Sequence, residues 1–222
     1  MMRLVIVGCG GFGREVHDVV DAINDNGGRI DLVGFVDDAP TVANVELVER
    51  RGSRVLGTMA WFDKAERGVQ YVIGIGSPAV CERIDTHLST LGFEAAVLVH
   101  PAATTGWEVT MSPGTIICAG ARLSTNIYLG RHVHVDRNCL IGHDSILQDW
   151  SILYPGAAVA GSVRLGRRTL IGSNATCLQS LEIGQDAVLG AGALLTRALP
   201  AKAVGVGVPA RWRDQPSPLE KQ

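Results

Sequence analysis

The chain has few aromatic residues, no long hydrophobic run and no excess of charge of either sign. Aromatic residues make up 5% of its 222 residues, so a core built on large rings is not expected. No stretch approaches the roughly 20 apolar residues of a membrane-spanning helix. The net charge of −2 does not favour a nucleic-acid partner. We therefore expect neither membrane insertion nor nucleic-acid binding, and the 27 glycines suit tight corners packed with aliphatic side chains.

We also expect neither a disulfide framework nor a secretory signal. The five cysteines are an odd number without framework spacing, which is typical of a reducing compartment. The opening stretch MMRLVIVGCGGFGRE has an apolar run of only about five residues, shorter than the hydrophobic region of a signal peptide. We therefore expect a cytoplasmic protein.

The strongest positive feature is an apolar residue at every sixth position of the second half of the chain. A step of six fits neither a helix nor an alternating strand, and it is typical of a β-helix in which each hexapeptide forms one side of a coil. Glycine often follows the apolar residue directly, where we expect special backbone angles. The repeated positions are Met111, Ile117, Leu123, Leu129, Val135, Ile141, Leu147, Leu153, Val159, Leu165, Ile171, Cys177, Ile183, Leu189 and Leu195.

Residues 1–99 follow a different pattern, in which strands alternate with helices. The expected strands are Arg3–Val7, Ile30–Val36, Val69–Ile75 and Phe93–Val99, and the expected helices are Arg14–Asn24 and Ala79–Leu91. This alternation predicts a small α/β Rossmann-like half-domain with helices on both faces of a parallel sheet. We therefore expect that domain over 1–99, a parallel β-helix over 100–212 with one last strand in an irregular cap, and a C-terminal tail over 213–222.

A glycine-rich turn, Gly8–Gly13, connects the first expected strand to the first helix and fits the pattern GxGxxG. Asp37 follows 24 residues after Gly13, near the position of a ribose-binding acid in dinucleotide-binding domains. The domain is too small to contain the second mononucleotide-binding half, so NAD is not expected. Helix N-terminal amides bind other phosphates equally well, and a purely structural glycine turn stays open.

His143 is the residue best suited to acid–base chemistry. It stands two positions after the inward Ile141, so its side chain is expected to point away from the coil interior. The ordinary histidine pKa of about 6.5 suits a general base at neutral pH. Asp144 follows directly. A surface histidine without function is the alternative interpretation.

The other nucleophilic or basic side chains are weaker candidates. His132 and His134 flank the inward Val133, and we expect both to face solvent or a neighbouring subunit. Cys118 is the only cysteine expected to point outward, while Cys139 falls on an inward position. If the chain transfers an acyl group, a direct transfer is therefore favoured over a covalent acyl-enzyme intermediate.

The chain resembles the left-handed β-helix sugar O/N-acetyltransferases over about residues 3–212, in the subgroup of sialic acid O-acetyltransferases and nucleotide-linked amino-sugar N-acetyltransferases. The stretches that carry the resemblance are VGCGGFGREV, GFVDD, GIGSP, LVHPAA, LIGHDSILQDWSILYPGAAVAGSVRLG, IGSNATCLQSLEIG, VLGAGALLTRALP and VGVPARW. The resemblance implies left-handed coils, acetyl-CoA as co-substrate and a homotrimer with sites at subunit interfaces. It also implies that His143 is the general base and that Asp144 raises its basicity.

The resemblance further implies where the substrates bind. The sugar acceptor, often a nucleotide diphosphate sugar, is expected at Gly10, Gly11, Phe12, Asp37, Asp38, Gly76 and Ser77. Acetyl-CoA is expected along the β-helix edge at Ile152, Gly161, Ser173 and Ala191.

Three departures from the relatives leave the acceptor undefined. Many relatives have histidine where Phe12 stands, at least one has histidine at Ile152, and they often have Asn-Thr at Asp136 and Arg137. The expected function is acetyl-CoA-dependent acetylation of a sugar, specifically the amino group of a nucleotide-linked amino sugar, for surface glycan biosynthesis. A sialic acid type O-acetyltransferase and a non-catalytic nucleotide-sugar-binding protein stay open. A β-helix zinc enzyme needs three converging histidines, and the H-x4-H pair is missing, so no metal is expected.

Overall fold

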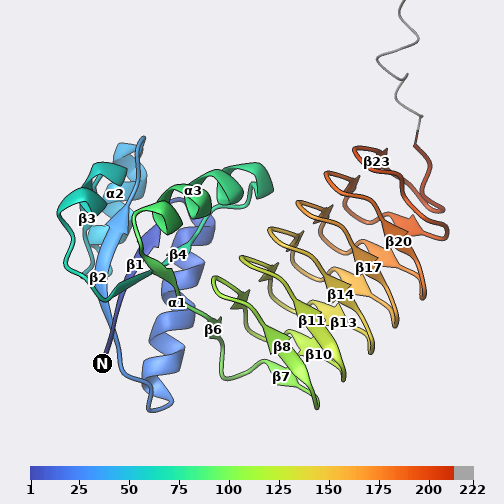
Figure 1. Ribbon diagram of the computed structural model, residues 1–222, viewed down its shortest axis with the longest axis horizontal. Coiled ribbons are helices and arrows are strands. Elements are labelled where there is room, and N and C mark those ends of the chain that lie inside the picture. Colours follow the sequence, from blue (N-terminus) through green and yellow to red (C-terminus); the bar gives the residue numbers. More distant parts are fainter. Residues whose placement is uncertain (213–222) are drawn as a thin grey trace, which may run out of the picture.

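The computed structural model describes residues 1–212, in which a small α/β domain stands at one end of a column of stacked coils (Figure 1). The tail predicted over 213–222 lies outside the described residues. Of the helices in residues 1–212, none combines the length and the apolarity needed to cross a bilayer.

The N-terminal domain contains one parallel sheet in the order β3-β2-β1-β4-β5. Alternate side chains of the central strand β1 point to opposite faces, so Leu4 and Ile6 pack in one hydrophobic cluster and Val5 and Val7 in another. Helix α1 contributes to the first cluster and α3 to the second, which confirms helices on both faces. The elements are β1 (Met2–Val7), α1 (Gly11–Asp25), β2 (Ile30–Val36), α2 (Val42–Glu49), β3 (Val55–Gly57), η1 (Met59–Lys64), β4 (Val69–Ile73), α3 (Pro78–Thr90) and β5 (Glu94–Ala95).

The sequence-based prediction of this domain was incomplete in one region and wrong at its end. It missed α2, β3 and η1, which lie between β2 and β4. The single strand expected over Phe93–Val99 is in fact two strands. β5 pairs with β4 in the N-terminal sheet, whereas β6 (Leu98–Val99) pairs with β9 in the coils. The chain therefore enters the β-helix directly from the last strand of the first domain.

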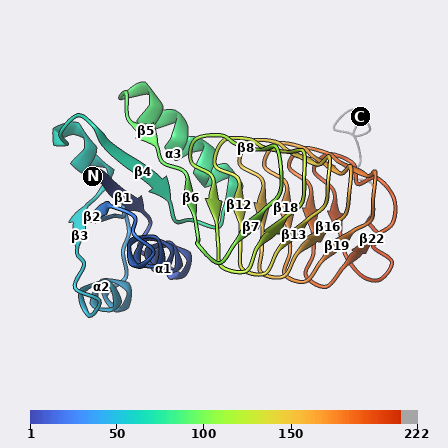
Figure 2. The same cartoon turned by 90° about the horizontal axis from the view of Figure 1, so that it is seen from below.

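Three parallel sheets form the faces of the β-helix (Figure 2). The domain-facing sheet contains β6, β9 (Ile116–Ile117), β12 (His134–Val135), β15 (Ile152–Leu153), β18 (Leu170–Ile171), β21 (Val188–Leu189) and β23 (Val204–Gly205). The groove sheet contains β7 (Thr104–Thr105), β10 (Arg122–Leu123), β13 (Leu140–Ile141), β16 (Ala158–Val159), β19 (Thr176–Cys177) and β22 (Leu194–Leu195). The third sheet contains β8 (Val109–Met111), β11 (Ile127–Leu129), β14 (Ile146–Leu147), β17 (Arg164–Leu165) and β20 (Glu182–Ile183). β23 is the last strand expected in the cap.

Successive coils are in register at a spacing of 18 residues, as in the pairing of His134 with Ile152. Every repeat residue from Ile117 to Leu195 is buried in one cluster, and Met111 packs partly against it. One hexapeptide cannot bury its apolar side chain alone, so the stack of coils supplies the core. This confirms the six-residue prediction.

The corners of the coils have left-handed backbone at the third residue after the repeat position, as at Asn126 (φ 56°) and Asp144 (φ 59°). The special angles expected at the glycine directly after the repeat residue are therefore wrong. Those glycines are required by contact between coils. A Cβ on Gly142 would lie 2.4 Å from the backbone nitrogen of Gly161.

The N-terminal domain covers the first strands of the domain-facing sheet. The outward side chains Leu98, Ile116, His134 and Ile152 are buried, whereas Val204 at the far end of the same sheet is 53% exposed. Leu98 and Ile116 share a hydrophobic cluster with α1, and Ile152 shares one with α3. The two domains therefore have common cores.

Candidate functional site

The corner between β13 and β14 presents His143 and Asp144 to solvent, with exposed side-chain fractions of 59% and 49%. His143 Nδ1 lies 2.6 Å from Asp144 Oδ2. An ionised carboxylate can only accept, so Nδ1 carries the proton in this contact and the lone pair of Nε2 is left for another partner. Sequence analysis predicted this outward pair, and the corner brings its members together.

Asp144 is itself held in place by the coil before it. The side-chain amide of Asn126 donates to Asp144 Oδ1 over 2.6 Å, and the backbone N–H of Asp144 donates to Thr125. The hydrogen bond from Asn126, then that from His143, lowers the pKa of Asp144 below its ordinary value. The carboxylate is therefore ionised at neutral pH and fixes the orientation of the imidazole.

Gly161 lies directly under the His143 ring, at the corresponding corner of the next coil. A Cβ at this position would approach His143 Nε2 to 2.6 Å. The same corner borders a groove of about 420 Å³ along the groove sheet. Most of the outward side chains that line the groove are apolar or small. They are Leu140, Ala158 and Thr176, together with the charged Arg122, and Gly142 and Ala160 lie at the edge of the corner.

A second cavity, which we call the edge cavity, opens at the carboxyl ends of the N-terminal sheet, where ligands bind in open α/β sheets. It has a volume of about 490 Å³. Its lining includes Gly8, Asp37, Asp38, Arg83 and His87. The predicted acceptor residues Asp37 and Asp38 therefore lie together here.

Both aspartates hold the backbone around the edge cavity. Asp37 accepts from the backbone N–H of Cys9 and Ala39, each over 2.9 Å, and Asp38 accepts from the backbone N–H of Met59 over 2.8 Å. Burial opposes ionisation of Asp37, but its hydrogen bonds outweigh burial and hold its pKa below the ordinary value. Asp37 thus fixes the glycine turn from a neighbouring strand.

The N-terminus of α1 leaves its first backbone N–H groups without a side-chain cap. Gly10 is its N-cap residue and contributes no side-chain hydrogen bond. A Cβ on Gly13 would lie 1.9 Å from the carbonyl oxygen of Gly8, so glycine is obligatory there. Ser77 is the N-cap residue of α3 and likewise makes no side-chain cap.

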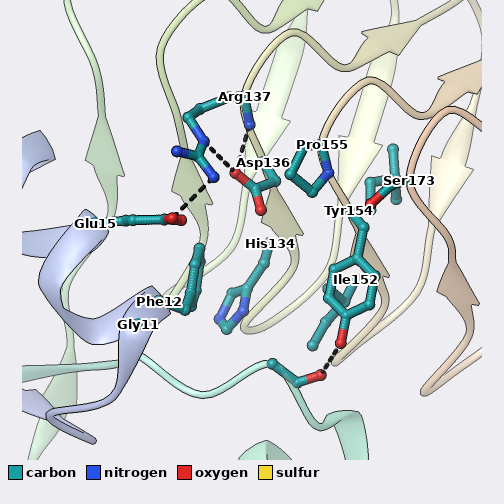
Figure 3. A pocket seen from close by; sticks show the side chains of 12 residues that line it. Gly11, Phe12, Glu15, His134, Asp136, Arg137, Ile152, Tyr154, Pro155 and Ser173 are labelled. Carbon is teal, nitrogen blue, oxygen red and sulfur yellow. Dashed lines mark hydrogen bonds and ion pairs between the residues drawn. The ribbon is translucent and has the colours of Figure 1, made fainter. Parts of the chain in front are cut away.

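A third cavity, the interdomain cavity, lies between the glycine turn and the β-helix and has a volume of about 350 Å³ (Figure 3). Its lining comprises Gly11, Phe12, Glu15, Gly76, His134, Asp136, Arg137, Ile152, Leu153, Tyr154, Pro155 and Ser173. The Tyr154 hydroxyl donates to the carbonyl oxygen of Gly76 over 2.9 Å and bridges the two domains. The predicted acceptor residues Gly11, Phe12 and Gly76 meet here.

The four positions predicted for acetyl-CoA do not meet within one chain. Ile152 is buried in the domain-facing sheet, and Gly161 lies under His143 at the corner between the groove sheet and the third sheet. Ser173 and Ala191 follow the domain-facing sheet at another corner, where Ala191 is exposed and Ser173 partly buried. The proposed donor site therefore spans two corners of the triangular coil.

The expectation for His132 and His134 was wrong, because both are fully buried. The docked N-terminal domain covers the corner and strand that carry them. His132 Nε2 lies 3.0 Å from Asp85 Oδ1 of α3, and the Tyr71 hydroxyl donates to the same oxygen over 2.7 Å. Burial alone would raise the pKa of Asp85, but hydrogen bonds from His132 and Arg131 hold it well below its ordinary value. No sequence signal linked α3 to this corner.

All five cysteines are buried. Cys118 points out of the coil core, as expected, but the N-terminal domain covers it. Burial raises the pKa of Cys139 and of Cys177 to about 12, so neither supplies a thiolate at neutral pH. In residues 1–212, no three His, Cys, Asp or Glu side chains gather into a group that could hold a metal ion.

The sequence of this chain is similar to two protein-family models and to known acetyltransferases. Residues 3–88 match the PglD N-terminal domain, and residues 162–197 match the hexapeptide repeat of succinyl-transferase. GDP-perosamine N-acetyltransferase from Escherichia coli O157:H7 is 28% identical over 188 residues, which cover 84% of this chain and 82% of the relative.

Several solved structures match almost the whole chain, among them the following two. The acetyltransferase domain of PglB from Neisseria gonorrhoeae FA1090, in complex with acetyl coenzyme A, is 25% identical with a TM-score of 0.83, covering 95% of this chain and 98% of that one. WeeI from Acinetobacter baumannii AYE is also 25% identical with a TM-score of 0.83, covering 96% of this chain and 100% of its own.

Proposed function

We propose that the chain transfers an acetyl group from acetyl-CoA to a nucleotide-linked amino sugar, because it is a left-handed β-helix acyltransferase homologous to sugar acetyltransferases. GDP-perosamine N-acetyltransferase and an acetyl-CoA-bound PglB domain are among its relatives. The observation that carries the proposal is the exposed His143–Asp144 pair at a corner that borders an apolar groove.

In the proposed mechanism, His143 Nε2 accepts a proton from the acceptor amine as the amine nitrogen attacks the thioester carbonyl carbon. The tetrahedral intermediate collapses, the carbon–sulfur bond breaks, and the departing CoA thiolate takes the proton from His143. Asp144 keeps Nδ1 protonated and stabilises the imidazolium between the two steps. The buried cysteines leave direct transfer as the simplest route.

The proposed acceptor lies along the N-terminal domain. The edge cavity with Asp37 and Asp38 takes the nucleoside, and the N-terminus of α1 at Gly10 takes the diphosphate. Gly11 and Phe12 then direct the sugar into the interdomain cavity. Gly76 and Ser77 form the opposite side of this path, at the start of α3.

The separation of the two corners supports a homotrimer. His143 projects between the groove sheet and the third sheet, whereas the interdomain cavity opens beside the domain-facing sheet. We propose that His143 of one chain faces the interdomain cavity of the next, which brings Gly161 of the first chain to Ser173 and Ala191 of the second. Three such contacts close a ring. We assign the reaction to the cytoplasm, in accord with five unpaired cysteines.

The direct test is release of free thiol from acetyl-CoA in the presence of UDP-, GDP- and dTDP-linked amino sugars. Turnover with at least one of them is expected, and mass spectrometry of the product shows whether the amine carries the acetyl group. Acetylation of a hydroxyl would identify a sugar O-acetyltransferase instead. Absence of thiol release with every amino sugar and with free sialic acid would refute an acetyltransferase acting on these sugars.

A further inference from the structure

The interdomain cavity contains a buried side chain that the proposed mechanism does not use. His134 is fully buried, and neither of its ring nitrogens has a hydrogen-bond partner within the described residues. Its ring lies against Phe12, with 5.1 Å between the ring centroids. Figure 3 shows the imidazole between Phe12 of the N-terminal domain and Ile152 of the next coil.

An unpaired imidazole in this position is energetically unfavourable for the free protein. Burying a polar group without a hydrogen bond costs free energy, and such groups in native proteins call for a specific explanation. Burial lowers the pKa of His134 to about 3, so the ring is neutral at physiological pH. A neutral imidazole has one donor and one acceptor nitrogen. Both are covered in the free protein, so a ligand in the cavity reaches them only when Phe12, which lies against the ring, moves aside.

The charges around the interdomain cavity restrict what that ligand is. Arg137 pairs with Glu15 over 2.8 Å and approaches Asp136 to 3.4 Å. Two carboxylates and one guanidinium leave the rim net negative, which disfavours a phosphate group. A diphosphate therefore fits the N-terminus of α1 at Gly10 better than it fits this cavity.

The walls of the interdomain cavity combine apolar faces with hydrogen-bonding groups. Phe12, Ile152 and Pro155 supply apolar surface, while His134 and Ser173 supply polar atoms. A sugar ring has the same mixture of apolar C–H faces and hydroxyl groups, whereas an acyl chain has no use for the rim charges. Gly11 lies both in the lining and in the first turn of α1, so a sugar here adjoins a diphosphate bound at that turn.

We propose that His134 is a specificity-determining residue whose imidazole hydrogen-bonds the sugar ring of the acceptor inside the interdomain cavity. This rests on the proposed function, because it takes the acceptor to be a nucleotide-linked sugar. The imidazole supplies recognition, and His143 supplies the base.

The test compares wild-type protein with His134→Leu and His134→Gln. Leucine fills the space without polar atoms, and glutamine keeps one donor and one acceptor. Steady-state kinetics use acetyl-CoA and whichever UDP-, GDP- or dTDP-linked amino sugar the wild type acetylates fastest. In His134→Leu, KM for that sugar should rise about tenfold with the lost hydrogen bond, while KM for acetyl-CoA stays unchanged. His134→Gln should recover part of the loss.

Thermal unfolding separates recognition from a structural role. His134→Leu removes unpaired buried nitrogens, so its melting temperature should equal or exceed that of the wild type. A lower melting temperature would make His134 a structural residue and overturn the assignment, and so would an unchanged KM for the sugar. A rise confined to KM for acetyl-CoA would place the acyl donor in the cavity instead. If the wild type acetylates none of the sugars, the proposed function fails first and this assignment falls with it.

Discussion

At the scale of single residues, the environment gives two histidines opposite properties. His143 is 59% exposed and has a carboxylate partner at 2.6 Å. His134 is fully buried and has no partner in the described residues. The first can gain a proton that Asp144 stabilises, whereas the second stays neutral. The same side chain thus suits a base at the corner and a hydrogen-bonding group in the interdomain cavity.

Replacing the proposed base should abolish most of the activity without affecting the fold. We expect His143→Ala to lower kcat by about 100-fold or more, which is the usual contribution of a positioned general base. The side chain is exposed, so the melting temperature should change little. Thiol-release kinetics and calorimetry measure the two quantities. Near-normal kcat in this variant would remove His143 from the mechanism.

Burial of His134 also predicts a pH dependence of stability. Its folded pKa of about 3 lies below the unfolded value of about 6.5, so the unfolded chain binds more protons between these pH values. The contribution of His134 to the free energy of unfolding is therefore fully present above about pH 6.5. Below that pH it is lost by up to about 1.4 kcal/mol per pH unit. Urea unfolding at pH 7 and pH 5 should show a smaller difference for His134→Leu. Equal differences in both proteins would contradict the prediction.

At the scale of elements, the prediction was accurate where one pattern repeats and poor where contacts are unique. A buried side chain at each sixth residue, such as Ile141, fixes the strands of the coils. Short elements such as β3 and η1 carry too few residues to show a period. His143 was found because its position relative to Ile141 makes it point outward. His134 also points outward from its coil, and only the docked domain, which leaves no local signal, buries it.

The stacking of corners predicts a residue that acts on catalysis through His143. In Gly161→Ala, the new Cβ would lie 2.6 Å from His143 Nε2, so the imidazole must rotate away from its position beside Asp144. The ring is the free end of an exposed side chain, so the fold should tolerate the change. We expect kcat to fall by roughly tenfold or more, because small displacements of a base are costly. In a His143→Ala background the same substitution should have no further effect on kcat, and an additional loss would contradict this coupling.

At the scale of the whole molecule, the two halves of the proposed site face different directions. The His143 corner and the interdomain cavity border different sheets of the same β-helix. A single chain therefore presents the proposed base beside the open groove at one corner, and the interdomain cavity without that base at another. We propose that association with a second copy completes the site.

This arrangement predicts complementation between two inactive variants. His143→Ala lacks the base, and Gly11→Trp fills the interdomain cavity, because a Cβ at Gly11 meets no atom within 4 Å. Co-expression of the two should recover about a quarter of wild-type activity, since random trimers pair an intact base with an open cavity at one interface in four. Each variant expressed alone is the control. No recovery in mixed trimers, confirmed by two affinity tags, would place the whole site within one chain.

The common core of the two domains has a consequence for how such enzymes exchange specificity. Leu98, Ile116, His134 and Ile152 belong to the coils by connectivity, yet the N-terminal domain buries them. The N-terminal domain therefore cannot be exchanged without changing the strands that it covers. A recombination event that replaces the N-terminal domain must therefore exchange these four positions together with it. Otherwise side chains that are buried at present would be exposed to water.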